Sequence, residues 1–244
     1  MTVRVPALRR PPIAFAHRGA RARTPENTLE AFRLALRLGA TGLESDVWLT
    51  ADGVPVLDHD GRVGSRLRGR RIADVGRDQL PDHIPTLEDL YDDCGTGFEL
   101  SLDVMDPAAF DAVVAVAEAA GDDALGRLWL CHPSWELVAS WRHVEGVRLV
   151  DSTRLSRLKE GPERRAATLA RVGIDAINLH HIDWTGGLTT LFHRFGVLAF
   201  GWDAQLRRVI DELLTIGVDG IYSDHPDVLH DAISAHKPPM SSNG

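Results

Sequence analysis

The chain has 244 residues, of which 44% are hydrophobic and 25% charged, and its formal net charge is −8 at pH 7. This length suits one or two globular domains with a sizeable core, and the negative charge argues against nucleic acid as the main partner. No run approaches the ~18 consecutive apolar residues of a membrane span, and the basic N-terminus lacks the apolar run of a signal peptide.

The first part of the chain predicts a strand followed by a helix. A short apolar run at 13–16 predicts the strand, which delivers His17 at its carboxyl end. Asn27 is a favourable N-cap, and Glu30 three residues later completes a capping-box pattern. Gly39 is expected to end this helix.

The next part predicts a hairpin and then an irregular segment. A strand is expected at 41–49, and the tight-turn pair Asp52-Gly53 joins it to a returning strand at 54–57. The segment at about 61–85 is polar, rich in Arg and Gly, and weakly periodic. We interpret it as an insertion into the main fold.

From Thr86, the expected N-cap of the next helix, helices and strands alternate regularly. Further strands are expected at 98–105, 127–131, 147–151, 174–179, 197–202 and 218–222. Further helices are expected at 107–120, 134–142, 162–172, 187–195, 206–216 and 226–235. We therefore predict one domain over 1–235, with a disordered polar tail at 236–244.

Eight strand–helix units in this length predict an α/β fold, a (β/α)8 TIM barrel with a small inserted subdomain after the second strand. A doubly wound open sheet is the alternative. Polar residues follow the ends of many of the predicted strands, and a barrel would gather them at one mouth. They include His17, Glu44, Asp46, Asp103, His132, Asp151, Asn178, Trp202 and Asp224.

Glu44 and Asp46 form the strongest candidate metal site. Residues i and i+2 of a strand share a face, and their apolar neighbours indicate burial. Asp103 ends a later strand in the same way and is a plausible third ligand. An all-oxygen site favours Mg²⁺ or Ca²⁺ over Zn²⁺. The alternative without a metal is that the two carboxylates are solvated on an edge strand or form ion pairs with nearby arginines.

His17 and His59 flank the carboxylate strand and are candidates for acid and base catalysis. With 11 histidines in the chain, any one alone is more often structural or exposed. His132, at the end of a later strand, is predicted to line the pocket and contact substrate. Arg18, directly after His17, is placed to bind a phosphate oxygen, although a surface charge is the simpler interpretation.

Two further residues are candidate substrate contacts. Trp202 could belong to the core or form an apolar wall for a glycerol-like group, and Asn178 is a polar candidate of lower weight. The two cysteines, Cys94 and Cys131, are too few for a disulfide framework. We predict reduced thiols in a cytoplasmic protein, a monomer or homodimer that acts on a small molecule.

Taken together, the motifs resemble those of the glycerophosphodiester phosphodiesterase family in order and spacing. They are the His-Arg-Gly at 17–19, the Pro-Glu-Asn-Thr at 25–28, Glu44-x-Asp46, Asp52-Gly53, His59-Asp60 and the closing segment 217–227. The likeness runs from about residue 13 to 229. Each motif alone is weak, whereas the whole set is specific.

The resemblance implies a TIM barrel with an insertion after the second strand. It also implies hydrolysis of glycerophosphodiesters to glycerol 3-phosphate and an alcohol, with Mg²⁺ or Ca²⁺ on Glu44 and Asp46. By position, His17 and His59 become the acid–base pair, and we assign His17 as the base and His59 as the acid. Arg18 becomes a phosphate ligand, and Trp202 takes the place of the family's late-strand tryptophan.

Three positions depart from the pattern that the resemblance implies. Asp103 stands where a Glu is usual, and Met105 stands where a Lys is usual. Loss of such a positive contact can cost ~10²–10³ in rate. Asp203-Ala204-Gln205 replaces the usual Thr-Val-Asn, and the added carboxylate would favour a cationic or polyhydroxyl head group.

The predicted function is metal-dependent phosphodiester hydrolysis, in which water or the substrate's own glycerol hydroxyl attacks phosphorus. One alternative is a related barrel phosphodiesterase that acts on lysophospholipids or sugar phosphodiesters. The other is a catalytically weakened barrel that binds phosphodiesters, an alternative that Met105 keeps open.

Overall fold

The fold is built on strands that pair around a closed ring. The structure is a computed structural model that describes residues 5–64 and 69–236, so the predicted tail lies outside the described residues apart from residue 236. The parallel strands are β1 (Ile13–His17), β2 (Gly42–Leu49), β6 (Glu99–Val104), β7 (Leu128–His132), β8 (Arg148–Ser152), β9 (Ala176–His180), β10 (Leu198–Trp202) and β11 (Gly220–Ser223). They follow the order β1-β11-β10-β9-β8-β7-β6-β2, and β1 also pairs with β2. The predicted (β/α)8 barrel is confirmed.

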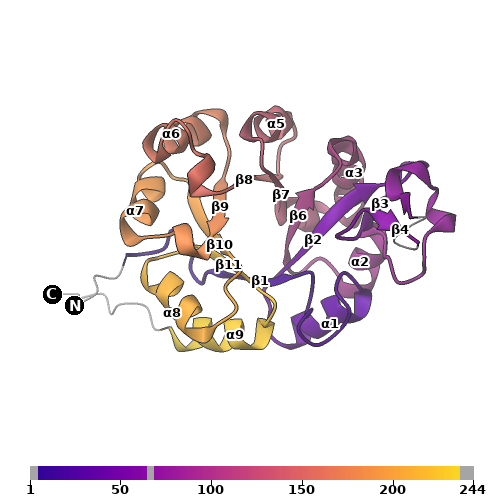
Figure 1. Cartoon of the computed structure of the whole chain (residues 1–244), viewed down its shortest axis with the longest axis horizontal. Coiled ribbons are helices and arrows are strands. Elements are labelled where there is room, and N and C mark those ends of the chain that lie inside the picture. The colour runs from indigo at the N-terminus through magenta and orange to yellow at the C-terminus, as the bar shows by residue number, and fades with distance from the viewer. Residues whose placement is uncertain (1–4, 65–68, 237–244) are drawn as a thin grey trace.

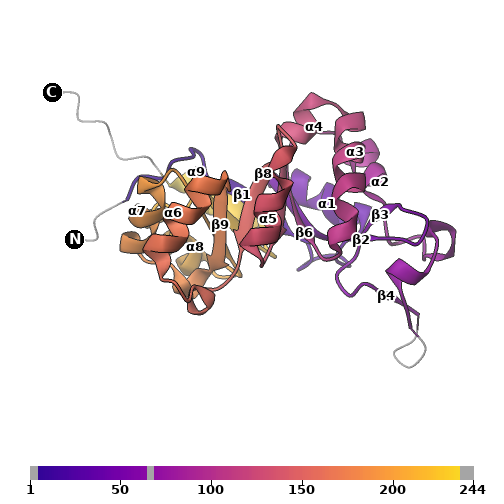
Figure 2. The same cartoon turned by 90° about the horizontal axis from the view of Figure 1, so that it is seen from above.

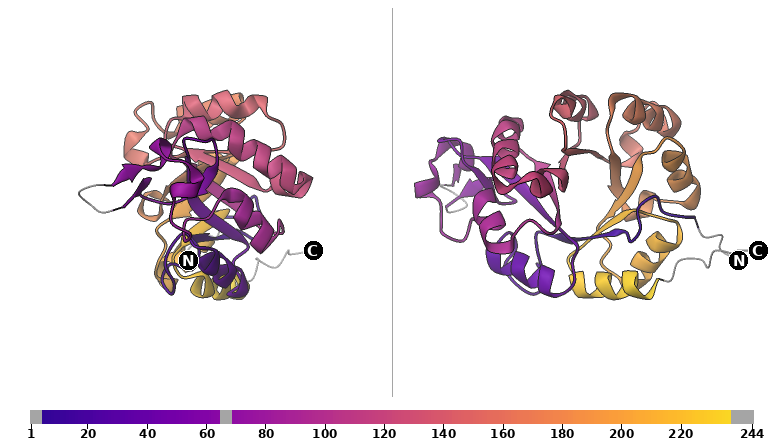
Figure 3. Two further views of the ribbon diagram at one scale, coloured as in Figure 1. Left: turned by 90° about the vertical axis from the view of Figure 1, so that its right-hand side faces the viewer. Right: turned by 180° about the vertical axis from the view of Figure 1, so that it is seen from behind.

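Helices surround this ring on the outside, most of them connect successive strands, and α9 follows the last strand (Figure 1; Figure 3 shows the same ring from behind). The α-helices are α1 (Leu29–Arg37), α2 (Leu87–Cys94), α3 (Phe110–Ala120), α4 (Asp122–Gly126), α5 (Trp135–Ser140), α6 (Pro162–Val172), α7 (Gly186–Arg194), α8 (Arg207–Thr215) and α9 (Pro226–Ala235). Short 3-10 helices are η1 (Ile72–Asp74), η2 (Arg77–Gln79), η3 (Pro107–Ala109), η4 (Trp141–His143), η5 (Leu155–Arg157) and η6 (His181–Asp183). None of the helices in the described ranges has the length and apolar character of a membrane span.

The helix starts show where local patterns were sufficient. Thr86 caps α2, as the sequence predicts, and it also forms a reciprocal capping box with Asp89. For α1 the predicted N-cap was wrong, because Thr28, one residue later, accepts from the backbone N–H of Ala31. Asn27 instead has φ 53° and its side chain accepts from Ser45, so a tertiary contact takes it out of the helix start.

Two apolar layers result from the alternation of side chains along the strands. Residues that face the barrel axis form one buried cluster: Ile13, Phe15, Trp129, Cys131, Val150, Ala176, Phe200 and Tyr222. The rings of Phe15 and Tyr222 stack 4.5 Å apart across it. The opposite faces of the strands pack against the helices in a larger cluster. The inward positions nearer the carboxyl ends of the strands carry polar groups, so the aromatic layer lies directly beneath these groups in the barrel.

The segment after β2 leaves the barrel. β3 (Pro55–Leu57) pairs antiparallel with the end of β2, and β4 (Arg62–Val63) pairs with β5 (Arg70–Arg71). A separate apolar cluster lies here, made by Val56, Ile72, Val75, Leu80 and Ile84. In Figure 2 this part projects from one end of the molecule, on the side opposite α4.

Candidate functional site

Three carboxylates from neighbouring strands meet at the barrel mouth. Glu44 and Asp46 come from β2 and Asp103 from β6, and Asp46 lies opposite Asp103 in the strand register. One ligand atom from each lies within 4.8 Å of the others. Glu44 and Asp46 are 4% and 5% exposed. Such a cluster in a low dielectric needs a positive group to offset its charge.

The ionisation of this cluster reflects that crowding. Burial, then the charges of Asp46 and Asp103, raise the pKa of Glu44 well above its ordinary value. Burial, then the charge of Asp46, raises the pKa of Asp103 to about 7. The pKa of Asp46 is also raised by burial, although the charge of Arg18 partly offsets this.

The donor set fits a hard divalent cation. Within the described residues, Asp46 Oδ2 is buried with no hydrogen-bond partner, although Arg18 Nε lies 3.3 Å away. An unbonded carboxylate oxygen in a buried cluster of three acids is what an oxygen-liganded cation would use. This observation supports the site that the sequence predicts at Glu44, Asp46 and Asp103.

His17 lies beside the cluster and is held by a carboxylate. Its Nδ1 is 2.7 Å from Asp224 Oδ1, and its Nε2 is 3.8 Å from Glu44 Oε2. Partial burial raises the pKa of Asp224, but the bond to His17 and the charge of Arg21 outweigh it, so the pKa is lowered overall. An ionised Asp224 accepts Nδ1–H and leaves the Nε2 lone pair directed toward the acid cluster.

The turn after β1 fixes Arg18 over the carboxylates. Arg18 has φ 53°, and its backbone N–H donates to Glu44 Oε2 at 2.9 Å. Gly19 follows with φ 77° and lies against α1. A Cβ on Gly19 would come within 2.7 Å of the backbone carbon of Ala31. The turn therefore needs glycine for both its conformation and its close approach.

Gly19→Ala should lower the free energy of unfolding by about 2–4 kcal/mol, because it adds left-handed strain to a backbone clash. The matched control is Gly53→Ala, since Gly53 has φ 82° but no atom within 4 Å of its Cβ position. Gly53→Ala carries the strain alone and should cost about 1–2 kcal/mol. Urea unfolding measures both, and equal losses would contradict the contact argument.

One cavity of about 570 Å³ joins this cluster to the opposite side of the barrel mouth. Among the predicted site residues, His17, Arg18, Glu44, Asp103, Asn178 and Trp202 line it. Asp203, whose carboxylate the sequence linked to the head group, also lines it, as do residues that were not predicted: Ser152, Thr153, Arg154, Arg157 and Tyr222. Asn178 Oδ1 is buried and makes no hydrogen bond within the described residues, so it remains available to a ligand.

The lining of this cavity leaves out three predicted site residues: Asp46, which belongs to the carboxylate cluster, His59 and His132. His59 follows β3, its side chain is 44% exposed, and its Nδ1 is 2.8 Å from Asp60. It is still near enough for its charge to lower the pKa of Asp46. His132 is not brought to the cavity. Its Nδ1 accepts from the backbone N–H of Ser134, and its ring packs edge-on against Trp141, which is a capping role.

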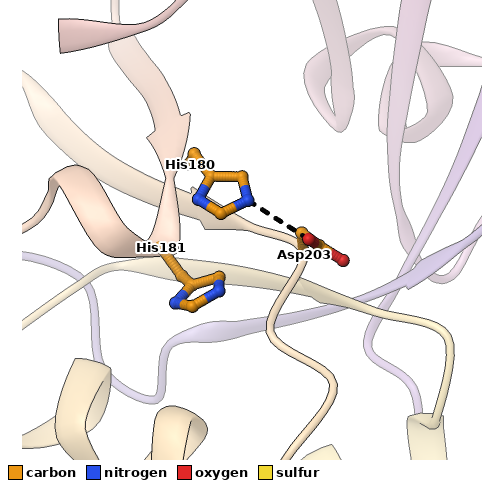
Figure 4. Close-up of side chains that lie close together, drawn as sticks. All are labelled: His180, His181 and Asp203. Atoms are coloured by element: carbon orange, nitrogen blue, oxygen red, sulfur yellow. Dashed lines mark hydrogen bonds and ion pairs between the residues drawn. The ribbon is translucent and has the colours of Figure 1, made fainter.

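A second cluster lies beyond Trp202 and contains His180, His181 and Asp203 (Figure 4). His180 Nε2 is 3.1 Å from Asp203 Oδ2, and its Nδ1 accepts from the backbone N–H of Ile182. These bonds place the ring proton on Nε2, where it points to Asp203. The arrangement is that of a histidine–carboxylate pair, since a metal on Nε2 would require Nδ1 to carry the proton.

Sequence reasoning missed the role of Asp224 and the presence of two arginines. Asp224 was expected at the barrel mouth as a polar strand-end residue, but its place beside His17 depends on the pairing of β1 with β11. Arg154 and Arg157 lie between β8 and α6, Arg157 at the end of η5, in a segment with no motif of its own. The available signal was their position shortly after a predicted strand, because the loops that follow barrel strands form the mouth of the barrel.

Comparison with known proteins gives a consistent result. The model of the Glycerophosphoryl diester phosphodiesterase family matches residues 17–228. A probable glycerophosphodiester phosphodiesterase 2 of Mycobacterium tuberculosis is 30% identical over 91% of this chain and 91% of that protein. Glycerophosphodiester phosphodiesterase 1 of Mus musculus is 41% identical, but over 33% of this chain and 30% of that protein. The chain thus spans less than a third of the mouse relative.

Solved structures share the fold at low sequence identity. A putative glycerophosphoryl diester phosphodiesterase from Silicibacter pomeroyi superposes with a TM-score of 0.81 at 24% identity, over 96% of each chain. An Oleispira antarctica phosphodiesterase in complex with the product sn-glycerol-3-phosphate has a TM-score of 0.79 at 21% identity, over 92% of this chain and 97% of that one.

Proposed function

This chain belongs to the glycerophosphoryl diester phosphodiesterase family, and on that premise we propose that it hydrolyses glycerophosphodiesters to glycerol 3-phosphate and an alcohol. The observation that carries the proposal is the cluster of Glu44, Asp46 and Asp103, of which Glu44 and Asp103 line one cavity together with His17. The product named for the Oleispira antarctica structure is in keeping with this reaction.

Glu44, Asp46 and Asp103 would hold a divalent cation, Mg²⁺ or Ca²⁺. When bound, such a cation polarises a phosphoryl oxygen and offsets the negative charge that develops on phosphorus. Arg18 lies over the same carboxylates and would bind a further phosphoryl oxygen. The cation and the Arg18 guanidinium would then both stabilise the negative charge of the phosphate.

His17 is assigned as the base. With Nδ1–H held by Asp224, its Nε2 accepts the proton of the attacking oxygen as the new bond to phosphorus forms. His59 is assigned as the acid and donates a proton to the alkoxide as its bond to phosphorus breaks. His17 gains one proton and His59 loses one, and proton exchange with solvent restores both histidines. The attacker is water, or it is the glycerol hydroxyl of the substrate, in which case water then opens the resulting cyclic phosphate to give glycerol 3-phosphate.

The test is release of glycerol 3-phosphate by purified protein from glycerophosphocholine, glycerophosphoethanolamine and glycerophosphoglycerol, with Mg²⁺ or Ca²⁺ and with EDTA. Metal-dependent release from at least one diester is expected. Lysophosphatidylcholine in the same assay tests the alternative that the protein acts on lysophospholipids, which predicts turnover of this lipid. No release from any diester, with binding that Glu44→Gln leaves unchanged, would reject the proposed reaction.

Metal affinity should rise with pH through about 7. The pKa of Asp103 is raised to about 7 in the metal-free protein, so below that pH a proton must leave before the carboxylate can bind the cation. Titration calorimetry at pH 6 and pH 8, in buffers of different ionisation enthalpy, should show about tenfold weaker binding and greater proton release at the lower pH. Equal affinity at both values would contradict ligation by Asp103.

We also propose a cytoplasmic location. Cys94 and Cys131 are both free thiols, and Cys131 is buried beside Ser101. Unpaired thiols are typical of a reducing compartment.

A further inference from the structure

The cavity has two ends on opposite sides of the barrel. In the order of strands around the ring, β8 lies four strands from β1 in either direction. His17 and Arg18 follow β1, whereas Arg154 and Arg157 follow β8. A barrel of this size is about 15 Å across between backbones, so long side chains from both ends leave space for one small molecule between them.

Arg154 and Arg157 differ from the other arginines of the site in having no acidic partner. Arg18 and Arg21 are neutralised by Glu26 and by further carboxylates. Within residues 5–64 and 69–236, neither Arg154 nor Arg157 makes an ion pair with a carboxylate. Two guanidinium groups that line a cavity without a carboxylate partner among the described residues point to an anion from outside the chain.

Arg154 is also held in place. Its guanidinium carbon lies 4.5 Å over the ring of Trp202. The loop that carries it is fixed on both sides of Arg154, since the backbone N–H of Thr153 donates to Asn178 O and that of Leu155 donates to Asp183 Oδ2. A stacked guanidinium on a fixed loop loses little entropy when it binds a ligand.

Asp203 is the group that would argue for a cationic ligand instead. Its two oxygens are already engaged, Oδ2 with His180 Nε2 at 3.1 Å and Oδ1 with Gln205 Nε2 at 3.2 Å. Figure 4 shows the carboxylate directed at His180. The negative charge at this end is therefore partly satisfied within the chain, while the two positive charges are not.

We propose that Arg154 and Arg157 form a subsite for an anionic head group. The substrate class is a glycerophosphodiester whose leaving alcohol carries a second phosphate or a phosphodiester, with the reacting phosphorus at the carboxylate end. The inference rests on the proposed hydrolysis and deepens it. It replaces the expectation of a cationic or polyhydroxyl head group drawn from Asp203.

The test compares 1,3-bis(glycerophospho)glycerol with glycerophosphoglycerol, whose leaving alcohol is glycerol without the second phosphodiester. Wild-type kcat/KM should be about 10-fold or more higher for the first diester, because each charge-assisted bond to arginine is strong. The double variant Arg154→Gln/Arg157→Gln should bring the two values to within about 3-fold by lowering only the first. The preference should also fall as ionic strength rises.

The matched control is Arg164→Gln, since Arg164 is an exposed arginine on α6 away from the cavity lining. It should leave both values unchanged. Equal wild-type rates on both diesters, or an equal loss on both in the double variant, would overturn the subsite while hydrolysis stands. If no diester is hydrolysed, the proposed function fails. Titration calorimetry with 1,3-bis(glycerophospho)glycerol then tests the subsite by itself. The subsite predicts that the double variant binds this diester more weakly than wild type does.

Discussion

Glu44→Gln should lower turnover by about 10³-fold and, at the same time, stabilise the metal-free protein. The loss of turnover follows from removing a carboxylate of the proposed cation site. The gain in stability follows from the pKa of Glu44, which burial and neighbouring carboxylates raise well above its ordinary value. A group whose pKa is higher in the folded state binds its proton more tightly there, so stability falls as pH rises above the unfolded value. Glutamine mimics the protonated form and removes this loss.

The measurements are steady-state rates and thermal unfolding with EDTA and with added metal. Above pH 7, metal-free Glu44→Gln should melt about 2–6 °C higher than wild type, and added metal should stabilise wild type far more than the variant. Glu118→Gln is the control, because Glu118 is an exposed carboxylate on α3. A metal-free variant that melts lower than wild type would show that Glu44 is not under electrostatic stress.

His17→Ala should lower kcat by about 10²–10⁴-fold while metal binding is kept, because His17 is assigned to proton transfer and not to the cation. Asp224→Asn should lower kcat by about 10–10²-fold with little change in KM. The carboxylate that accepts Nδ1–H of His17 would be lost, and with it the fixed tautomer. Rates, KM values and metal titrations of both variants check these expectations.

Added imidazole should restore part of the activity of His17→Ala and none of that of Asp224→Asn, which still has its imidazole ring. His83→Ala is the control, since His83 is exposed on the segment after β5. If Asp224→Asn raised KM as much as it lowered kcat, Asp224 would act on substrate binding and not on the orientation of His17.

The strand order and the closure of the barrel could be predicted because both follow from repeated alternation of apolar strands and helices. Local capping was less certain. Asn27 and Thr28 are both good N-caps, and the choice depends on a bond from Ser45, which is remote in sequence. The short helix α4, which follows Gly121 directly, was missed because five residues hold too little periodicity to be seen.

Within the candidate site, side chains on strands could be predicted from their spacing, and Arg18 and His59 from their motifs, whereas the arginines between β8 and α6 could not. Glu44, Asp46 and Asp103 were found because period two fixes the side of a strand on which each lies. His132 fits the same rule, yet its ring caps the start of α5 by accepting from Ser134. Arg154 lies in a loop, where conformation depends on contacts with Asn178 and Trp202 that no local pattern encodes.

The stacked rings of Phe15 and Tyr222, which close the barrel beneath the cavity, have a kinetic consequence. With no passage through the barrel, both products must leave by the opening through which the substrate entered. Glycerol 3-phosphate, retained at the carboxylate end, would depart after the alcohol at the Arg154 end. It would then compete with incoming substrate, so the enzyme would slow as its own product accumulates and turnover would depend on how quickly that product is consumed.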